Sequence, residues 1–394
     1  MRILIGHNHY QQFGGEDAAV GLEIELLRSR GHEVLLVEMS NKDFNRLSLP
    51  RKIKNILSWD FSPESYQLIK RKCQEFRPDI AHFHNTFFMM TPGVYDACRE
   101  LDVPLVQTLH NFRLLCSNAL FFRHGRPCEE CLTFSLRRGI RYGCYHGSRW
   151  LTWAVVRMLE KHWKKRTWGL KIDALIVFSD FFRQKLIMAG IPAENIWIKP
   201  NFIFPDPGVR QNYQPYFVFA GRLSEEKGLR VLLEAFKHLP EVKLIIMGDG
   251  PLKKEAIGFI KRHKLFNIEL KGFLQEEAYW SMIKAATAVI VPSICYENFP
   301  MLMVEAFACG VPVIASRLGS MQTIVEDKKT GMLFKACDAD DLAEKVRQLV
   351  SNGDLVRTLG LKAREEYLGK YTSECNYQQL RKVYESAICK KSKI

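Results

Sequence analysis

The sequence predicts an α/β protein built from two Rossmann-like halves, each with a parallel sheet. Short apolar, β-branched runs alternate with helical segments along the chain, which is typical of doubly wound sheets. The chain has 394 residues, more than one hydrophobic core normally holds. A stretch rich in proline and glycine, residues 200–215, interrupts the alternation near the middle and reads as a linker.

The alternation places strands at intervals in both halves. The expected strands of the first half are residues 3–6, 34–37, 80–84, 105–109 and 174–178. Those of the second half are residues 217–220, 244–247, 268–270, 288–291, 313–315 and 332–334. We expect a first domain over residues 1–204, a second over 205–370, and a helix over 371–394 that crosses back to the first domain and ends in a basic stretch, Lys390, Lys391 and Lys393. Two such domains would face one another across a cleft.

Composition excludes several classes of protein. Hydrophobic residues make up 47% of the chain, as in a globular protein with an ample core. The sequence has no run of about 18 apolar residues and no secretory signal, so we expect a cytoplasmic protein. Eleven cysteines in such a compartment indicate free thiols rather than a disulfide framework.

The net charge of +14 is concentrated in one segment. Between Arg123 and Lys171, basic residues greatly outnumber acidic ones and are interleaved with Trp150, Trp153, Trp163 and Trp168. Three interpretations remain open. The segment is a solvated basic helix with a core-facing apolar stripe, a surface that docks on anionic membranes, or a nucleic-acid contact.

Residues 296–307 are the most informative stretch of the chain. Glu297 and Glu305 bracket the start of a helix that directly follows the buried strand 288–291 and stops at Gly310. An α/β sheet places its ligands at such a junction. Helix N–H groups favour phosphate and carboxylates accept hydrogen bonds from hydroxyls, so the pattern indicates a sugar-nucleotide site. The alternative is that Glu297 caps the helix and Glu305 is solvated.

Charged residues and glycines follow other strands in the same way. Arg222 and Lys227 come after strand 217–220, beside Gly221 and Gly228, and are suited to holding a diphosphate. After the first strand, the turn Gly14-Gly15 with Glu16 and Asp17 lets backbone approach a phosphate and begins a helix. His110 follows strand 105–109. Each of these residues also has an ordinary structural interpretation as a turn, cap or solvated charge.

An insert over residues 112–171 carries four cysteines. Cys116, Cys128, Cys131 and Cys144 contain one Cys-x2-Cys pair, and His124 and His146 lie nearby. Four such thiolates match the ligand set of a structural zinc site. Structural zinc, ordinary free thiols and redox chemistry all remain open for this cluster.

Taken in order, these landmarks resemble retaining glycosyltransferases of family 4, the group 1 glycosyltransferases with the GT-B architecture. The resemblance spans nearly the whole chain. The matching motifs are Gly14-Gly15-Glu16, Thr108-Leu109-His110-Asn111, Ala220-Gly221-Arg222-Leu223 with Lys227-Gly228, Met247-Gly248-Asp249-Gly250-Pro251-Leu252, and Glu297 to Glu305 followed by Ala308-Cys309-Gly310.

The resemblance implies a role for each motif. Glu305 would bind the ribose hydroxyls and Glu297 the sugar hydroxyls of the donor. The catalytic set would be His110, Arg222, Lys227 and Glu297, and the donor site would be completed by Gly15, Asn298, Phe299, Pro300, Met301 and Leu302. Gly14, Glu16 and Asp17 would lie on the acceptor side. No Asp-x-Asp pair occupies a suitable loop, so no metal cofactor is expected for catalysis.

The implied reaction moves a hexose, with retention, from a nucleoside diphosphate sugar to a hydroxyl group. We expect a UDP-sugar donor, with a GDP-sugar as second choice, and a saccharide or polyprenyl-diphosphate-linked acceptor from surface polysaccharide or lipopolysaccharide biosynthesis. The enzyme would sit peripherally on the inner face of the cytoplasmic membrane, bound to its anionic surface, and would not bind nucleic acid. The alternatives are a GT-B sugar-nucleotide epimerase and a non-catalytic protein that binds nucleotides or nucleic acid.

Overall fold

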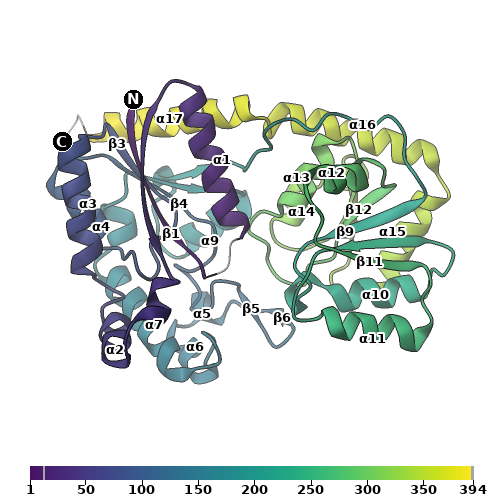
Figure 1. Cartoon of the computed structure of the whole chain (residues 1–394), viewed down its shortest axis with the longest axis horizontal. Coiled ribbons are helices and arrows are strands. Elements are labelled where there is room, and N and C mark those ends of the chain that lie inside the picture. Colours follow the sequence, from purple (N-terminus) through teal and green to yellow (C-terminus); the bar gives the residue numbers. More distant parts are fainter. Residues whose placement is uncertain (12–13, 392–394) are drawn as a thin grey trace. The chain divides into compact units, whose positions relative to one another are not determined.

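The computed structural model describes residues 1–11 and 14–391 (Figure 1). The chain divides into two compact units. The first comprises residues 1–121, 128–199 and the chain from 376 onward, and the second comprises residues 122–127 and 200–375. Each unit is built on a six-stranded parallel sheet, so the predicted pair of Rossmann-like halves is confirmed.

The sheet of the first unit has the strand order β2-β1-β3-β4-β7-β8. Its strands are β1 (Arg2–His9), β2 (Glu33–Ser40), β3 (Ile80–Phe83), β4 (Leu105–Thr108), β7 (Ala174–Val177) and β8 (Ile196–Ile198). All five expected strands are present. β8 was not predicted, because three residues are too short to show a periodic pattern. The chain passes from β1 to β2 on one side and then to β3 on the other, which makes the β1/β3 boundary the topological switch point.

Helices surround this sheet. They are α1 (Gly15–Ser29), α2 (Leu49–Leu57), α3 (Pro63–Phe76), α4 (Val94–Glu100), α5 (Glu130–Thr133), α6 (Arg137–Tyr142), α7 (Arg149–Lys164), α8 (Thr167–Leu170), α9 (Asp180–Met188) and α17 (Ser373–Lys391), with 3-10 turns at Asp43–Arg46 and Ala193–Asn195. Local chemistry sets several starts. Ser148, for example, accepts a hydrogen bond from the N–H of Leu151 at 3.3 Å and caps α7.

Helix α17 belongs mainly to the first unit, although it follows the second in sequence. In Figure 1 it is the yellow helix beside the purple N-terminal strand. Its buried Leu380, Val383 and Tyr384 pack with Ile3 and Ile5 of β1 in one hydrophobic cluster. The predicted apolar face of this helix therefore has a partner. Of the predicted basic end, Lys390 donates to Asn195 Oδ1 at 2.8 Å, and Lys393 lies outside the described residues.

The second unit has the strand order β11-β10-β9-β12-β13-β14, all parallel. These strands are β9 (Tyr216–Ala220), β10 (Lys243–Met247), β11 (Ile268–Gly272), β12 (Ala288–Val291), β13 (Val313–Ser316) and β14 (Gly331–Phe334), which match all six expected positions. Its helices are α10 (Leu229–Lys237), α11 (Lys253–His263), α12 (Glu276–Lys284), α13 (Met301–Ala308), α14 (Met321–Ile324), α15 (Ala339–Val350) and α16 (Gly353–Lys370), with a 3-10 turn at Glu225–Lys227.

A short hairpin from the insert groups with the second unit. It consists of β5 (Phe122–Arg123) and β6 (Arg126–Pro127), which pair antiparallel. Phe122 packs against Ile294 and Cys295, which directly follow β12. The hairpin is therefore a neighbour of the loop that carries the predicted donor residues.

The four tryptophans of the basic segment separate into two classes. Trp168 is fully buried, and the indole N–H of Trp163 donates to the carbonyl of Leu114 at 2.8 Å. Trp150 and Trp153 on α7 are exposed. Trp168 on α8 therefore belongs to the core of the first unit, and Trp163 on α7 is half-buried, so only Trp150 and Trp153 of the four are exposed on the surface. Within the described residues, no helix combines the length and apolar character that crossing a bilayer requires.

Candidate active site

The predicted donor residues of the second unit lie at its topological switch point. The chain moves outward from β9 through β10 to β11 and then returns to pair β12 on the other side of β9. Arg222 and Lys227 follow β9, and Glu297 follows β12. Because β9 and β12 are adjacent and parallel, their carboxyl ends lie at the same edge of the sheet, where α/β proteins bind ligands.

Lys227 and Glu297 meet at this edge. Lys227 Nζ lies 2.7 Å from Glu297 Oε1, and the hydroxyl of Ser293 donates to the same oxygen at 2.6 Å. The hydroxyl of Ser320 donates to the backbone carbonyl of Glu297 at 2.5 Å. Burial opposes the charge on Lys227, but the Glu297 carboxylate outweighs it, so the pKa of Lys227 is raised. The ammonium is therefore held as a cation beside a carboxylate.

Gly228 makes this approach sterically possible. Its φ is +73°, and a Cβ built there would lie 1.8 Å from the carbonyl oxygen of Pro292, just after β12. Only a residue without a side chain brings the backbone after β9 this close to the loop after β12. The glycine thereby fixes Lys227 next to Glu297.

Arg222 stands apart from this ion pair. It is exposed, and within the described part of the chain its side chain makes no ion pair or hydrogen bond. A guanidinium at the end of β9 with its donors uncommitted is available to an anionic ligand.

Glu305 lies on α13, the helix that follows the turn after Glu297. The hydroxyl of Tyr279, from α12, donates to Glu305 Oε2. Burial raises the pKa of Glu305, and burial together with the adjacent carboxylate raises the pKa of Tyr279 well above its usual range. Tyr279 was not predicted as a site residue, because a tyrosine in a helix carries no local signal of its partner.

The remaining predicted donor residues form the entry to α13. Asn298, Phe299 and Pro300 make up the turn after Glu297, and Met301 and Leu302 are the first helical residues. The strand, turn and helix predicted for residues 288–310 are therefore all present. Backbone N–H groups at the start of α13 point out of the helix end, as in other anion sites.

The glycine turn of the first unit follows β1. Gly14 precedes α1, and Gly15 is its first residue. Asp17 is buried: its Oδ1 lies 2.9 Å from His7 Nε2 and 2.8 Å from His9 Nδ1, and its Oδ2 accepts from the N–H of Gly14 at 2.9 Å. Asp17 thus shapes the turn with a carboxylate that is already occupied. A Cβ at Gly15 would meet nothing within 4 Å among the described residues, so this position is open.

Glu16 carries an unusual carboxyl group. Burial raises its pKa to about 8, with the charge of Asp17 adding to the effect and hydrogen bonding from Tyr10 opposing it. The carboxyl group is therefore uncharged at neutral pH, and it sits beside Tyr10, whose hydroxyl accepts from Asn111 Nδ2 at 2.8 Å. A protonated carboxyl group can donate as well as accept.

His110 lies two residues beyond β4. Its Nε2 is 3.0 Å from Nδ1 of His84, the residue after β3, and its ring packs edge-on against Phe178 with centroids 5.1 Å apart. Burial, together with His84, lowers the pKa of His110 well below its usual range. The ring is neutral and held from one side.

The four insert cysteines do not gather into a metal site. Among the described residues, two groups of three or more possible ligands come close together, His7 with His9 and Asp17, and Glu23 with His82 and His84, and neither contains a cysteine. Cys116 and Cys131 do contact one another: their hydrogen bond lowers the pKa of Cys131 to about 6. Of the three interpretations left open for these cysteines, structural zinc therefore has no support from the geometry.

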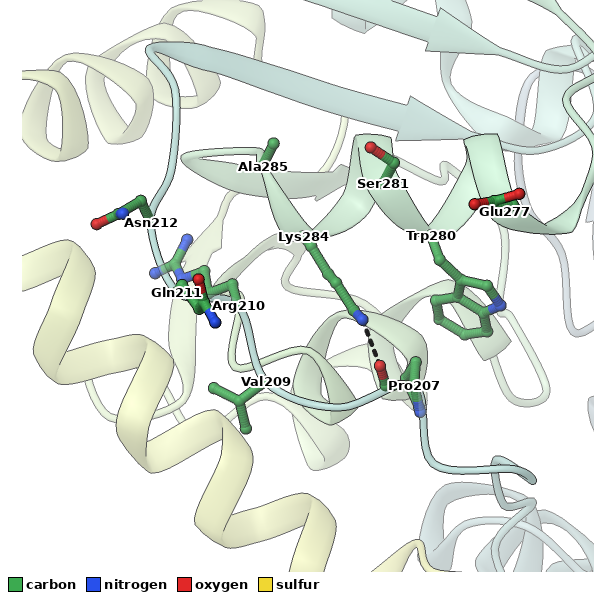
Figure 2. Close-up of a pocket in the computed structure, with 10 residues that line it drawn as sticks. All are labelled: Pro207, Val209, Arg210, Gln211, Asn212, Glu277, Trp280, Ser281, Lys284 and Ala285. Carbon is green, nitrogen blue, oxygen red and sulfur yellow. Dashed lines mark hydrogen bonds between the residues drawn. The ribbon is translucent and has the colours of Figure 1, made fainter.

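A separate hollow of about 660 Å³ lies in the second unit between the 200–215 segment and α12 (Figure 2). Figure 2 shows Lys284 Nζ donating to the carbonyl of Pro207 across it. Arg210 donates to the carbonyls of Ala286 at 2.8 Å and Val356 at 3.3 Å. Both cations bind backbone carbonyl groups, and these hydrogen bonds anchor the linker to the second unit. None of the predicted donor residues lines this hollow.

Two Rossmann-like units, each with a topological switch point, are the architecture of GT-B glycosyltransferases. Residues 204–366 match the family model described as glycosyl transferases group 1, and residues 18–206 match that of glycosyltransferase family 4. Over 391 residues the chain is 34% identical to an uncharacterized glycosyltransferase of Methanocaldococcus jannaschii, covering 98% of both proteins. The chain belongs to this group 1, family 4-like glycosyltransferase family, and the protein is a hexosyltransferase.

Two further similarities cover almost the whole chain. It is 24% identical over 413 residues to the phosphatidyl-myo-inositol mannosyltransferase of Mycobacterium leprae, covering 97% of this chain and 95% of that protein. Its fold resembles that of Anabaena HepE, solved in complex with UDP, with a TM-score of 0.68 at 18% identity, covering 98% of this chain and 100% of that one. The second similarity concerns the fold alone.

Proposed function

We propose that this glycosyltransferase moves a hexose from a UDP-sugar to a hydroxyl group of a lipid-linked or saccharide acceptor, with retention of anomeric configuration. The observation that carries the proposal is the Lys227–Glu297 pair at the switch point of the second unit. A cation for the leaving diphosphate and a carboxylate for sugar hydroxyls stand side by side there.

The donor side follows from charge and position. Arg222 and Lys227 hold the diphosphate, Glu297 accepts hydrogen bonds from the sugar, and Glu305, braced by Tyr279, accepts them from the ribose. The backbone N–H groups of Asn298, Phe299, Met301 and Leu302 complete the site, and Pro300, which has no N–H, shapes the turn between them. By the family resemblance, Gly15 is assigned to donor binding, and Gly14, Glu16 and Asp17 to the acceptor. UDP is the preferred nucleotide because a structural neighbour of the same fold was solved with UDP.

The chemistry requires one bond exchange. The bond between the anomeric carbon and the phosphate oxygen breaks, a bond to the acceptor oxygen forms on the same face, and the acceptor proton passes to the leaving phosphate. Arg222 and Lys227 stabilise the charge that develops on that phosphate. Oε1 of Glu297 is already held by Lys227 and Ser293, which suits a binding group better than a nucleophile.

A membrane-bound acceptor is supported by one face of the first unit. On α2, Leu49, Ile53 and Leu57 recur at four-residue spacing and are 71%, 44% and 45% exposed. Arg51 and Lys54 on the same helix are exposed as well. Exposed apolar side chains flanked by cations match the chemistry of an anionic bilayer surface.

Helix α7 extends this face. It contacts α2, and Arg157 of α7 donates to the carbonyl of Leu57. The exposed Trp150 and Trp153 lie on α7, with the Arg157 guanidinium 5.8 Å from the ring centroid of Trp153. We call α2 together with Trp150 and Trp153 the α2–α7 face. The relative that acts on a phosphatidyl-inositol by name is consistent with a lipid-linked acceptor, here in surface polysaccharide synthesis.

Vesicle flotation tests the membrane part of the proposal. We expect binding to vesicles containing an anionic phospholipid, weakened at high salt, and about tenfold weaker binding for Ile53→Ser. Leu361→Ser, which changes an apolar side chain on α16 that is 66% exposed, is the matched control and leaves binding unchanged. Equal binding of the two variants, or binding to duplex DNA instead, contradicts this part.

Nucleotide release tests the reaction. Purified protein is incubated with UDP-, GDP- and ADP-sugars, with and without chelator, in the presence of a membrane lipid extract. We expect release of UDP from one donor, dependent on lipid and insensitive to chelator, and a product whose anomeric configuration by NMR equals that of the donor. A product of inverted configuration would refute retention. Epimerised donor without transfer would favour the epimerase alternative, which the similarity to named glycosyltransferases does not favour.

A further inference from the structure

The ring of His110 is held from behind by a buried chain of side chains in the first unit. Nδ1 of His84 lies 3.0 Å from Nε2 of His110. On its other side, Nε2 of His84 lies 3.3 Å from Oε1 of Glu23, which is on α1. His84 and Glu23 are only 4% and 3% exposed. The segment after β3 therefore contacts His110 directly, and α1 contacts that segment from behind.

Glu23 is a carboxylate in this setting. Burial opposes its charge, but Lys199 and His82 outweigh burial and hold the pKa of Glu23 well below its usual range. Lys199 Nζ donates to Oε2 at 2.8 Å. An ionised carboxyl group has only acceptors. The atom of His84 that faces Glu23 must therefore carry the hydrogen.

The same reasoning fixes the other nitrogen of His84. His84 Nε2 and Glu23 Oε1 lie within ion-pair distance of each other but outside regular hydrogen-bond geometry, and neither atom has a hydrogen-bond partner among the other described residues, although Oε1 also lies 3.2 Å from His82 Nδ1. Burial and the neighbouring His82 lower the pKa of His84 to about 3, so the ring is neutral. With its hydrogen on Nε2, His84 offers a lone pair at Nδ1.

That lone pair determines the tautomer of His110. Of the two facing atoms, His84 Nδ1 accepts, so His110 Nε2 donates across the 3.0 Å contact. Since His110 is neutral, its Nδ1 holds the remaining lone pair. This Nδ1 makes no hydrogen bond to a described residue. It is also absent from the buried polar atoms that lack a partner. It is the open end of the chain.

We propose that Glu23 and His84 are positioning residues that fix His110 as a hydrogen-bond acceptor at Nδ1, ready for a hydroxyl group of a sugar. The identity of that ligand rests on the proposed function. A hydroxyl has a hydrogen to give, whereas an oxygen without a hydrogen gains nothing at this atom. The relay thereby makes His110 selective for the class of group it contacts.

A metal ion at the same residues is the competing explanation. One ligand atom each of Glu23, His82 and His84 lie within 4.8 Å of one another. However, the Lys199 ammonium already balances the carboxylate, and His82 is engaged on both nitrogens, 2.7 Å from the hydroxyl of Tyr384 and 2.8 Å from that of Thr108. Hydrogen bonds and the Lys199 charge therefore satisfy these side chains without a metal ion.

Long-range proton–nitrogen NMR correlation reads the tautomer directly. The ligand-free protein is labelled with nitrogen-15 histidine, and His110→Asn and His84→Asn assign the two signals. We expect neutral rings with the hydrogen on Nε2 for both His84 and His110 at neutral pH. A hydrogen on Nδ1 of His110, or a doubly protonated ring, overturns the proposal. No substrate is involved, so this result is independent of the proposed reaction.

A variant pair tests the relay as such. Glu23→Gln turns an acceptor into a group that can donate to His84, which reverses the chain and places the hydrogen on Nδ1 of His110. We expect that switch in the spectrum together with an about tenfold fall in kcat/KM for donor turnover, the scale of one hydrogen bond. Tyr384→Phe, which removes the hydroxyl on the His82 branch only, should leave the His110 tautomer unchanged.

The outcomes separate a relay from mere packing. Lower activity of a folded Glu23→Gln protein with an unchanged His110 tautomer would make Glu23 a structural residue and refute the relay. If Glu23→Gln does not fold, the wild-type spectrum still decides the tautomer. If the tautomers behave as expected but no donor is turned over, the positioning stands and the proposed reaction fails.

Discussion

Replacing Lys227 by methionine separates the chemical role of this residue from its contribution to stability. The ammonium lies 2.7 Å from Glu297 Oε1, and the two side chains are 32% and 12% exposed. A partly exposed ion pair contributes about 1 kcal/mol. Leaving Glu297 with Ser293 as a remaining donor brings the cost of Lys227→Met to about 1–3 kcal/mol. Folding free energies are about 5–15 kcal/mol, so the variant stays folded.

Turnover should respond far more strongly than stability. Loss of one charge-stabilising group at the leaving phosphate lowers the rate by about 100-fold or more. The assay is nucleotide release from the preferred donor, run alongside denaturant unfolding. Lys237→Met is the matched control, because Lys237 forms a similar ion pair with Glu234 at 2.8 Å on α10, away from the site. Turnover of folded Lys227→Met within about threefold of the wild type would refute the assignment of Lys227 to the diphosphate.

Two further predictions concern stability. Gly228→Ala should destabilise the protein by about 3 kcal/mol or more in denaturant unfolding, because the new Cβ would meet Pro292 O at 1.8 Å and φ is positive. Gly258→Ala on α11, where a Cβ meets nothing within 4 Å, should instead stabilise by about 0.5–1 kcal/mol. Equal effects would contradict the steric argument. Burial raises the pKa of Glu16 from 4.5 to about 8, so the unfolded chain loses this proton first and stability falls as pH rises between these values. Glu16→Gln should match the wild type near pH 4 and exceed it by at least about 1 kcal/mol near pH 9, whereas parallel stability curves would show an ordinary carboxyl group.

Strand positions and the donor motif could be predicted because their signals are local. A run such as residues 288–291 is apolar and β-branched, and buried parallel strands need that composition on both faces. Turn residues after such a run mark the edge of the sheet where a ligand binds. Arg222, Lys227 and Glu297 could therefore be predicted to lie at one edge of the sheet without knowing which strands pair.

Partners distant in sequence could not be predicted. Lys227 and Glu297 are 70 residues apart, and they meet because β9 and β12 are neighbours in the sheet. The same holds for Tyr279 with Glu305, which comes from the packing of α12 beside α13. Trp163 and Trp168 were grouped with the surface tryptophans because composition does not reveal which face of a helix is buried.

The sequence by itself determined the two Rossmann-like halves, the family and the residue types at the predicted donor site, since these depend on periodicity and short motifs. The tertiary structure alone decided the state of each group. In the folded protein the carboxylate of Asp17 already has a hydrogen-bond partner, and the four insert cysteines share no metal-binding centre. Glu23, His84 and His110 form one chain of contacts. Hydrogen-bond direction and proton affinity depend on burial and on neighbours brought together by strand order, and neither is written in any local stretch of sequence.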